Sequence, residues 1–329
     1  MEHKPSAIPQ EKIQHLQETL KNTKSELAKV ITGMDSSIDA ILLAILSKGH
    51  VLLEGMPGLA KTLLAKTFAE VLDSDFHRIQ FTPDLLPADL TGTTIFNPKT
   101  ASFDVRKGPV FTGILLADEI NRAPAKVQSA LLQCMEERLV TIGEETFQLD
   151  SNFFVLATQN PIDQEGTYQL PEAQTDRFML KLKVGYPSEE QELGILEQHG
   201  KTQIKNLRPI IKSKDRNQFS ELAESIFIDD KLKEYIVRIV RETRPETSKI
   251  NDTKTFIKHG ASPRASLALL KIAKAKALTE GRDFVVPEDI QIFAKEILRH
   301  RILLNYEAMA EDVSIDNLIE VILETLGVP

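Results

Sequence analysis

The chain has 329 residues, of which 42% are hydrophobic and 27% are charged, and its formal net charge is −8. This composition is typical of a globular protein with room for two domains, and it excludes a disordered chain or a fibre. The acidic balance argues against a protein whose main role is to coat nucleic acid, although a local basic pore is still compatible with it.

A single cysteine, Cys134, excludes an intrachain disulfide framework, and its apolar helical neighbours predict a core position rather than a nucleophile. The sequence has no signal-peptide pattern and no run of about 18 apolar residues. We therefore expect neither secretion nor a membrane span, and we predict a cytoplasmic protein. The histidines lack metal-ligand spacing, so we predict no zinc site.

The first predicted element is a helix over residues 10–30, with a plausible buried stripe that includes Ile13, Leu16 and Leu20. A turn around Ile31 and Gly33 then precedes a second helical pattern over 38–46. Because this turn lies just upstream of a glycine-rich loop, we expect it to hold the base of a nucleotide.

Strands and helices then alternate up to residue 183. This alternation predicts an α/β fold with a parallel sheet between helical layers, and ligands at the carboxyl ends of the strands. The expected strands are 50–54, 76–80, 112–117, 153–158 and 178–183, with helices over 61–72 and 124–138. Two inserted hairpins, near 95–105 and 140–149, are expected either to protrude or to be simple edge structure.

The pattern changes to amphipathic helices near residue 186. We predict two domains: residues 1–186, an α/β core with the N-terminal helix and both hairpins, and residues 187–329, a small all-helical lid. The expected lid helices are 188–199, 217–226, 229–243, 263–279, 287–299 and 314–325.

The stretch Gly55–Thr62 follows an apolar strand and opens a helix, which is typical of a phosphate-binding loop. Lys61 would be electrostatically unfavourable in a first helical turn unless an anion lay beside it. The hydroxyl of Thr62 is then placed to bind Mg²⁺. Ala60 stands where the strict pattern has glycine, and the alternative is an ordinary strand-to-helix turn. The predicted nucleotide-binding residues are Ile31, Gly33, Gly55, Pro57, Gly58, Leu59, Ala60, Lys61, Thr62 and Leu63.

Two adjacent carboxylates, Asp118 and Glu119, end another buried strand. We expect the phosphate loop to lie on a neighbouring strand end, where Asp118 would hold Mg²⁺ and Glu119 would orient the attacking water; the alternative is an acidic cluster at a helix start. Asn160 ends the next strand, where it could bind that water or the γ-phosphate, or simply form an Asn-Pro turn.

Two arginines are candidates for catalysis. Arg177, just before the last strand, could act as an arginine finger on a neighbouring subunit, or pair at the surface with Asp176 or Glu172. Arg264 lies in the first turn of a helix capped by Ser262, where the dipole disfavours it. That mismatch suggests an anionic partner, although an exposed arginine remains an alternative.

In chain order, these motifs resemble the MoxR family of AAA+ ATPases, in which alanine before the lysine is a usual variant. The stretches that carry the resemblance are Gly55–Thr62, Ala117–Ala123, Ala157–Pro161, Gly166–Gln174 and Asp176–Phe178. The resemblance implies a P-loop NTPase fold. It also implies roles for Lys61 and Thr62 (Walker A), Asp118 and Glu119 (Walker B), Asn160 (sensor 1), Arg177 (arginine finger) and Arg264 (sensor 2), with Arg122 as a further family arginine of unassigned role.

The resemblance further implies that the chain binds ATP and Mg²⁺ between the core and the lid and hydrolyses the ATP. It implies a homo-oligomeric ring of six subunits whose two hairpins face the pore or a partner. MoxR members are thought to be chaperones that act on protein clients, often with von Willebrand factor A (VWA) domain partners in enzyme maturation or metal insertion. The alternatives are a nucleic-acid motor, which the hairpin residues Lys99, Glu144 and Glu145 make less favourable, and a nucleotide-gated binding module with little turnover.

Overall fold

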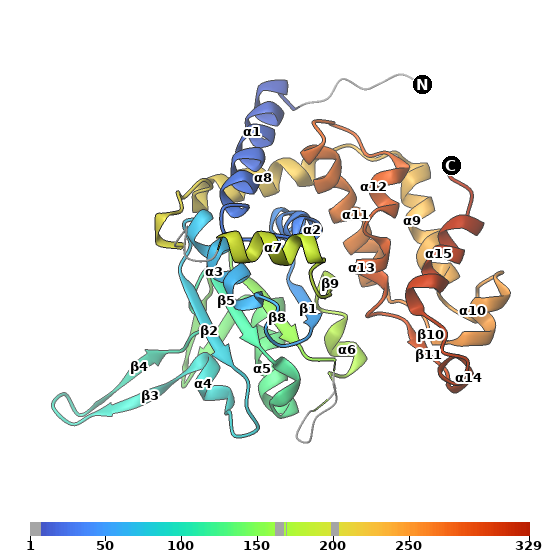
Figure 1. The fold of residues 1–329 in the computed structure, drawn as a ribbon. Coiled ribbons are helices and arrows are strands. Elements are labelled where there is room, and N and C mark those ends of the chain that lie inside the picture. Colours follow the sequence, from blue (N-terminus) through green and yellow to red (C-terminus); the bar gives the residue numbers. More distant parts are fainter. Residues whose placement is uncertain (1–7, 162–167, 169, 199–203) are drawn as a thin grey trace.

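A five-stranded parallel sheet forms the centre of the first domain in the computed structural model, which describes residues 8–161, 168, 170–198 and 204–329 (Figure 1). The strand order is β2-β5-β8-β1-β9, and Val51 of β1 lies between Leu156 of β8 and Leu180 of β9. The strands are β1 (Val51–Gly55), β2 (Phe76–Gln80), β5 (Ile114–Asp118), β8 (Phe154–Gln159) and β9 (Leu180–Val184). The predicted parallel sheet is confirmed.

Both faces of the sheet are buried under helices. Successive residues of a strand point to opposite faces, so each strand contributes side chains to both cores. In β5, Ile114 and Leu116 join the core on one face, whereas Leu115 and Ala117 join the core on the other. The first face is covered by α1 (Gln10–Leu27), α2 (Asp35–Leu46) and α3 (Lys61–Val71). The second is covered by α4 (Pro87–Thr91) and α5 (Ala125–Glu137). The result is the predicted three-layer core.

The predicted core position of Cys134 in α5 is also confirmed. Its side chain is buried, and burial raises the pKa of the thiol to about 11. At that pKa the thiolate is scarce near neutral pH, which disfavours a nucleophilic role.

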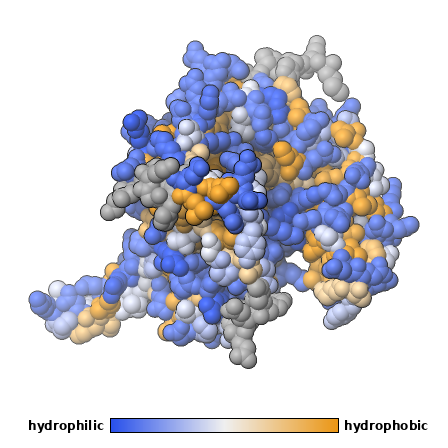
Figure 2. Space-filling model, viewed as in Figure 1, coloured by the Kyte–Doolittle hydropathy of each residue, from blue (hydrophilic) through white to orange (hydrophobic). Residues whose placement is uncertain are grey.

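The two hairpins differ in how they meet the core. The first, β3 (Gly92–Asn97) with β4 (Ser102–Lys107), projects far from the sheet, and apolar residues are visible along it (Figures 1 and 2). The second, β6 (Leu139–Ile142) with β7 (Glu145–Gln148), is held by the buried side chains of Val140 and Ile142. The first therefore protrudes, and the second is packed against the domain.

The helical region, residues 204–329, forms the second part of the molecule (Figure 1). It also contains a short antiparallel pair, β10 (Ile257–His259) with β11 (Leu303–Leu304), so it is not purely helical as predicted. The predicted helix 287–299 is two helices separated by a break at 292–293. Its elements are η2 (Ile204–Asn206), α8 (Ser213–Ser225), α9 (Asp230–Glu242), α10 (Asn251–Phe256), α11 (Pro263–Thr279), α12 (Pro287–Gln291), α13 (Ala294–Leu298), α14 (Tyr306–Ala310) and α15 (Ile315–Thr325).

The helix α7 (Glu189–Gln198) was assigned by prediction to the second domain, but its residues meet the first. A Cβ on Gly33 would meet the side chain of Gln191, and a Cβ on Gly194 would meet Thr32. The boundary between the two domains at residue 186 stays a prediction. Residue 199, the last residue of the predicted helix 188–199, lies outside the described residues.

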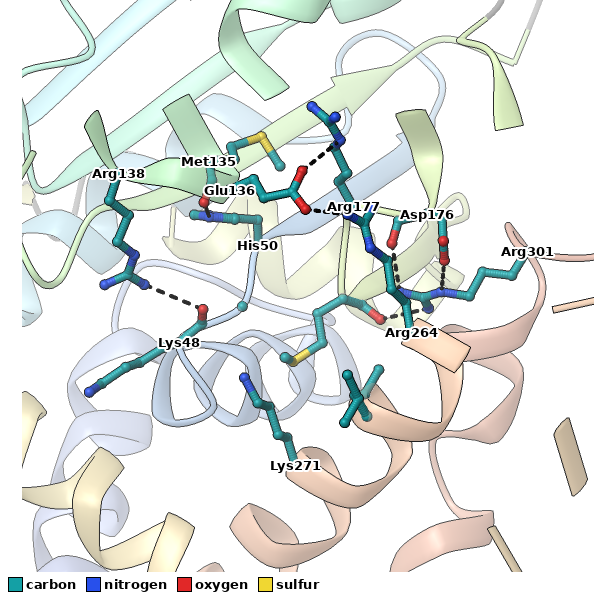
Figure 3. A pocket seen from close by; sticks show the side chains of 14 residues that line it. Lys48, His50, Met135, Glu136, Arg138, Asp176, Arg177, Arg264, Lys271 and Arg301 are labelled. Atoms are coloured by element: carbon teal, nitrogen blue, oxygen red, sulfur yellow. Dashed lines mark hydrogen bonds and ion pairs between the residues drawn. The ribbon is translucent and has the colours of Figure 1, made fainter. Parts of the chain in front are cut away.

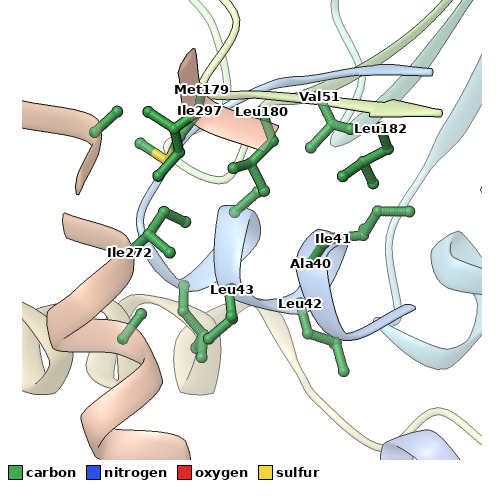
Figure 4. Packing of buried hydrophobic residues seen from close by; sticks show 14 of the residues in the cluster. Ala40, Ile41, Leu42, Leu43, Val51, Met179, Leu180, Leu182, Ile272 and Ile297 are labelled. Carbon is green, nitrogen blue, oxygen red and sulfur yellow. The ribbon is translucent and has the colours of Figure 1, made fainter. Parts of the chain in front are cut away.

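The cores of the two parts are continuous through α2. Ile41 and Leu43 of α2 belong to the same buried cluster as Leu180 of β9 and Ile272 of α11, and Figure 4 shows Ile41 beside the strand residue Leu182. The helical region therefore shares a packed core with the sheet on this side. None of the helices in the described part of the chain combines the length and the apolar character needed to cross a bilayer.

Candidate functional site

The predicted phosphate loop, Gly55–Thr62, leaves the carboxyl end of β1 and enters α3. Gly55 passes so close to β9 that a Cβ would lie 2.6 Å from the carbonyl oxygen of Val184. Gly58 and Ala60 have φ of 86° and 50°, in the left-handed region. Glycine adopts this region freely but alanine does so at a cost of about 1 kcal/mol, so Ala60 carries strain that glycine would avoid.

The start of α3 offers unpaired donors for an anion. Within the described part of the chain, the backbone N–H groups of Lys61, Thr62 and Leu63 donate no hydrogen bond, as expected for a first helical turn. The Nζ of Lys61 donates to the carbonyl oxygen of Gly55 at 2.5 Å. Burial lowers the pKa of Lys61, and the nearby charges of Asp118 and Glu119 oppose that shift. These groups suit a phosphate with its bound cation.

Asp118 and Glu119 lie at the end of β5, at the same edge of the sheet as the phosphate loop. However, β5 is not adjacent to β1, the strand that precedes the loop. β8 separates β5 from β1, which corrects the expectation that the two strand ends are neighbours. The buried Thr158 of β8 fills that position: its Oγ1 donates to Asp118 Oδ1 at 2.6 Å and accepts from the backbone N–H of Glu119 at 2.8 Å.

Two residues of β2 complete this corner of the site. Arg78 donates to Asp118 Oδ2 through Nε at 3.0 Å and Nη2 at 2.8 Å. Gln80 donates to Glu119 Oε2 at 2.8 Å. The same Glu119 oxygen accepts from Arg122 Nη1 at 2.9 Å, which places this unassigned family arginine beside the predicted water-orienting carboxylate.

A divalent cation fits the oxygen donors at this edge. The hydroxyl of Thr62 and the carboxylate of Asp118 are the hard ligands that Mg²⁺ prefers, and Mg²⁺ commonly keeps several waters and phosphate oxygens as its other ligands. Within the described residues, no cluster of three or more His, Cys, Asp or Glu residues could hold a metal by protein side chains alone. The cation would therefore depend on the nucleotide for most of its ligands.

The remaining predicted residues on this side are placed less directly. Asn160 follows β8, and its backbone oxygen accepts from Asn121 Nδ2 at 3.4 Å. Ile31 is buried in the core, whereas Gly33 has φ of 77° and lies under α7. Residues 166, 167 and 169 of the motif Gly166–Gln174 lie outside the described residues.

Arg177 and Arg264 lie together in a different pocket (Figure 3). Arg177 Nε lies 3.1 Å from Glu136 Oε2, an ion pair without hydrogen-bond geometry, and Arg264 pairs with the other carboxylate oxygen. Arg177 therefore pairs neither with Asp176 nor with Glu172. Among the described residues that line this arginine pocket, six are cationic and two carry carboxylates; the cations are Lys48, Arg138, Arg177, Arg264, Lys271 and Arg301.

This arginine pocket is at the opposite edge of the sheet from the phosphate loop. It is lined by Lys48 and His50, which precede β1, whereas the phosphate loop follows β1. β1 has five residues and so spans roughly 17 Å at about 3.3 Å per residue. Arg264 therefore lies away from the phosphate loop of its own chain, because the fold carries α11 to the amino ends of the strands.

Sequence reasoning did not assign roles to Arg78, Gln80, Thr158 or Glu136. The signals were a polar residue at the end of an apolar strand, as for Thr158, and charged or polar residues near the end of β2. Such residues are common on exposed strand ends, and only the strand order shows that they face Asp118 and Glu119.

Comparisons with known proteins agree with this architecture. The profile of the ATPase family associated with various cellular activities (AAA) matches residues 50–180, and that of the AAA lid domain matches residues 250–322. A crystal structure of a Cytophaga hutchinsonii protein is similar to this one, with a TM-score of 0.91 and 47% identity over 97% of both chains.

Two curated relatives cover most of the chain. The YeaC protein of Bacillus subtilis is 46% identical over 92% of both chains. The chaperone MoxR1 of Mycobacterium tuberculosis is 48% identical over 94% of this chain and 82% of its own length. The chain belongs to the MoxR family of AAA+ ATPases.

Proposed function

We propose that this chain hydrolyses ATP as a subunit of a homo-oligomeric ring and uses the energy to remodel protein clients. One observation supports the ring above all: the phosphate loop and the paired arginines lie at opposite edges of the same sheet. A head-to-tail contact between two copies would bring one copy's arginines to the other copy's loop, and repetition of that contact gives a ring when the rotation between copies closes. We infer six subunits from the family.

Within one subunit, each group has a role that its position supports. The backbone N–H groups at the start of α3 and the Lys61 ammonium bind the phosphates, and Thr62 and Asp118 hold the cation. Mg²⁺, when bound, neutralises phosphate charge as it develops. Glu119 accepts a proton from the attacking water, and Asn160 orients that water or the γ-phosphate. The turn at Ile31 and Gly33 is our proposed site for the base.

The neighbouring subunit supplies the remaining charge. We infer that Arg177 and Arg264 both contact the γ-phosphate bound by the adjacent copy. An arginine donated across an interface in this way can contribute on the order of 10³ or more in rate. Because the same interface holds both arginines, hydrolysis would be coupled to movement between subunits.

The client is proposed to be a protein. The relative MoxR1 is named a chaperone, and the projecting hairpin exposes Phe96 and Phe103, whose rings lie 5.3 Å apart. Exposed aromatic side chains on a protruding element suit transient contact with apolar segments. A VWA-domain partner in enzyme maturation or metal insertion remains part of the proposal.

The paired variants Lys61→Ala and Glu119→Gln test the ATPase. Lys61→Ala should weaken ATP binding at least about 10-fold, because a charge-assisted hydrogen bond is lost. Glu119→Gln should bind ATP normally but hydrolyse it about 10²- to 10⁴-fold more slowly, because the general base is removed. Binding is measured by fluorescence titration with a labelled ATP, and hydrolysis by phosphate release.

Two exposed residues supply matched controls, Lys66→Ala about one and a half turns further along α3 and Glu145→Gln on β7. Both should behave as wild type. Unchanged ATP affinity in Lys61→Ala would refute the phosphate-loop assignment. Negligible phosphate release by the wild-type ring would instead favour a nucleotide-gated binding module.

A further inference from the structure

The carboxylate of Asp176 joins the turn that carries Arg177 and leads into β9 to the helical region. Its Oδ1 accepts from Arg301 Nε at 2.7 Å, and its Oδ2 accepts from Ser262 Oγ at 2.7 Å. Asp176 directly precedes Arg177 in the chain, whereas both donors belong to the helical region. Each carboxylate oxygen of Asp176 therefore accepts a hydrogen bond from a different part of the helical region.

Ser262 extends this connection to Arg264. A serine hydroxyl has one hydrogen and two lone pairs, and an ionised carboxylate can only accept, so the hydrogen points to Asp176. The same oxygen caps α11 by accepting from the backbone N–H of Arg264 at 3.1 Å. One oxygen atom thus separates the backbone of Arg264 from the carboxylate that precedes Arg177.

Arg301 fixes the backbone on both sides of Arg177. Its side chain is 3% exposed, and its Nη atoms donate to the carbonyl oxygens of Asp176 at 3.1 Å, Phe178 at 2.6 Å and Met179 at 3.2 Å. His300 adds a hydrogen bond of 3.0 Å to the Phe178 oxygen. Buried bonds of this kind leave the segment little freedom to move apart from the helical region.

The side chains of the two arginines are linked as well. Glu136, at the end of α5, has one carboxylate oxygen against Arg177 and the other against Arg264. The two guanidinium groups consequently lie on either side of one carboxylate (Figure 3). Arg177 and Arg264 are therefore connected both by hydrogen bonds to their backbone segments and by the carboxylate that their side chains share.

We propose that Asp176 is a positioning residue that sets the spacing of Arg177 and Arg264 through Ser262 and Arg301. The two guanidinium groups then meet a neighbour's γ-phosphate as one rigid unit rather than as independent side chains. This inference rests on the proposed function, in which both arginines act across the subunit interface. Its physical basis is that a misplacement of about 1 Å can cost about 10²-fold in rate.

Ser262→Ala in the full-length ring is the first test, because it removes the bridge and leaves both arginines and Asp176 in place. We expect kcat for ATP hydrolysis to fall about 10-fold or more. The ATP affinity of the subunit's own phosphate loop should stay within about 2-fold, because that loop lies at the other edge of the sheet. Ser262→Thr retains the hydroxyl and should restore kcat to within about 2-fold of wild type.

Asp229→Ala is the matched control. Asp229 also caps a helix of the helical region, accepting from the backbone N–H of Lys231 at 2.8 Å. It should lower the melting temperature about as much as Ser262→Ala, through the loss of a cap, yet leave kcat unchanged. An equal fall of kcat in both variants would assign the effect to helix capping and overturn the inference.

A double-variant comparison shows whether Ser262 acts through the arginines. Ser262→Ala added to Arg177→Ala should lower kcat by a smaller factor than in the wild type, because only Arg264 is left to be misplaced, and the full wild-type factor would overturn the inference. Asp176→Asn, which replaces an acceptor oxygen by a donor, should repeat the kcat loss of Ser262→Ala.

The failures of the two proposals are distinguishable. Normal kcat in Arg177→Ala and Arg264→Ala would overturn the proposed function together with this inference. A large loss in both arginine variants with normal kcat in Ser262→Ala would overturn the inference alone.

Discussion

Thr158 determines how the two carboxylates at the end of β5 are held. It is fully buried, donates to Asp118 and accepts from the backbone of Glu119. The sequence places all three residues at strand ends, but it does not say that β8 lies between β5 and β1. That arrangement depends on strand order, which residue types do not encode locally.

His50 is a second residue whose role only the structure defines. Its Nδ1 accepts from the backbone N–H of Val155 at 3.0 Å, so Nε2 carries the hydrogen and donates to the Met135 oxygen at 3.2 Å. Burial, with a contribution from the charge of Arg138, lowers its pKa to about 4 from 6.5. The imidazole is therefore neutral in the folded protein at any pH well above 4.

Acid should destabilise the fold through His50. Below about pH 6.5 the unfolded chain binds a proton that the folded chain takes up only near pH 4, so stability falls across that window. Between pH 8 and pH 5 this amounts to about 2 kcal/mol. His50→Asn can keep the hydrogen bond from Val155 through its amide oxygen, and it does not titrate. In urea denaturation, wild type should lose about 2 kcal/mol more than His50→Asn over that range; equal losses would contradict the assignment.

The two hairpins show that similar sequence patterns can serve different purposes. Both were predicted from alternating residues around a turn, and both are present. The sequence does not distinguish them, because each has apolar residues on alternate positions. Packing does: Ile142 is 3% exposed on the second hairpin, whereas Ile95 is 46% exposed on the first.

The same substitution in each hairpin should therefore have different effects. Ile142→Ala should cost about 2–5 kcal/mol of unfolding free energy, because it leaves a cavity in a packed core. Ile95→Ala should cost less than about 1 kcal/mol, because its side chain is already half in water. Both are measured by urea denaturation. Similar losses would mean that the first hairpin packs against the protein rather than projecting from it.

The phosphate loop and the two arginines lie at opposite edges of the sheet, and in our proposal this separation makes the activity depend on how copies of the chain assemble. One copy has the phosphate loop at the carboxyl ends of its strands and the arginines at the amino ends. Neither edge is a complete site under our proposal. A monomer should therefore hydrolyse ATP poorly, and activity should depend on contact between copies.

Mixing two defective subunits tests this dependence. Lys61→Ala chains lack a working loop and Arg177→Ala chains lack a working finger, so each ring alone should be nearly inactive. In a one-to-one mixture, about one interface in four pairs an intact loop with an intact finger, and activity should recover towards that fraction. Phosphate release is the measurement.

The control mixture combines Arg177→Ala with the double variant Lys61→Ala, Arg177→Ala. No interface in that mixture has an intact finger, so no recovery is expected. Recovery in the control, or none in the test mixture, would contradict action between subunits.

The parallel α/β core and the family were predictable from the sequence, which also placed Gly55–Thr62, Asp118 and Glu119 at strand ends. These follow from short-range features: apolar periodicity, turn residues and motifs whose spacing along the chain fixes their geometry. It also placed Ser262 and Pro263 correctly at the start of α11.

Which of these parts come into contact depends on the three-dimensional fold. Strand order placed Thr158 beside Asp118, and the path of the helical region carried Arg264 to Arg177 rather than to the loop of its own chain. Packing of elements far apart in the sequence, here α11 against α2 and α13 against β9, depends on the whole core. The phosphate loop was thus predictable from the sequence, but its separation from the arginines was not.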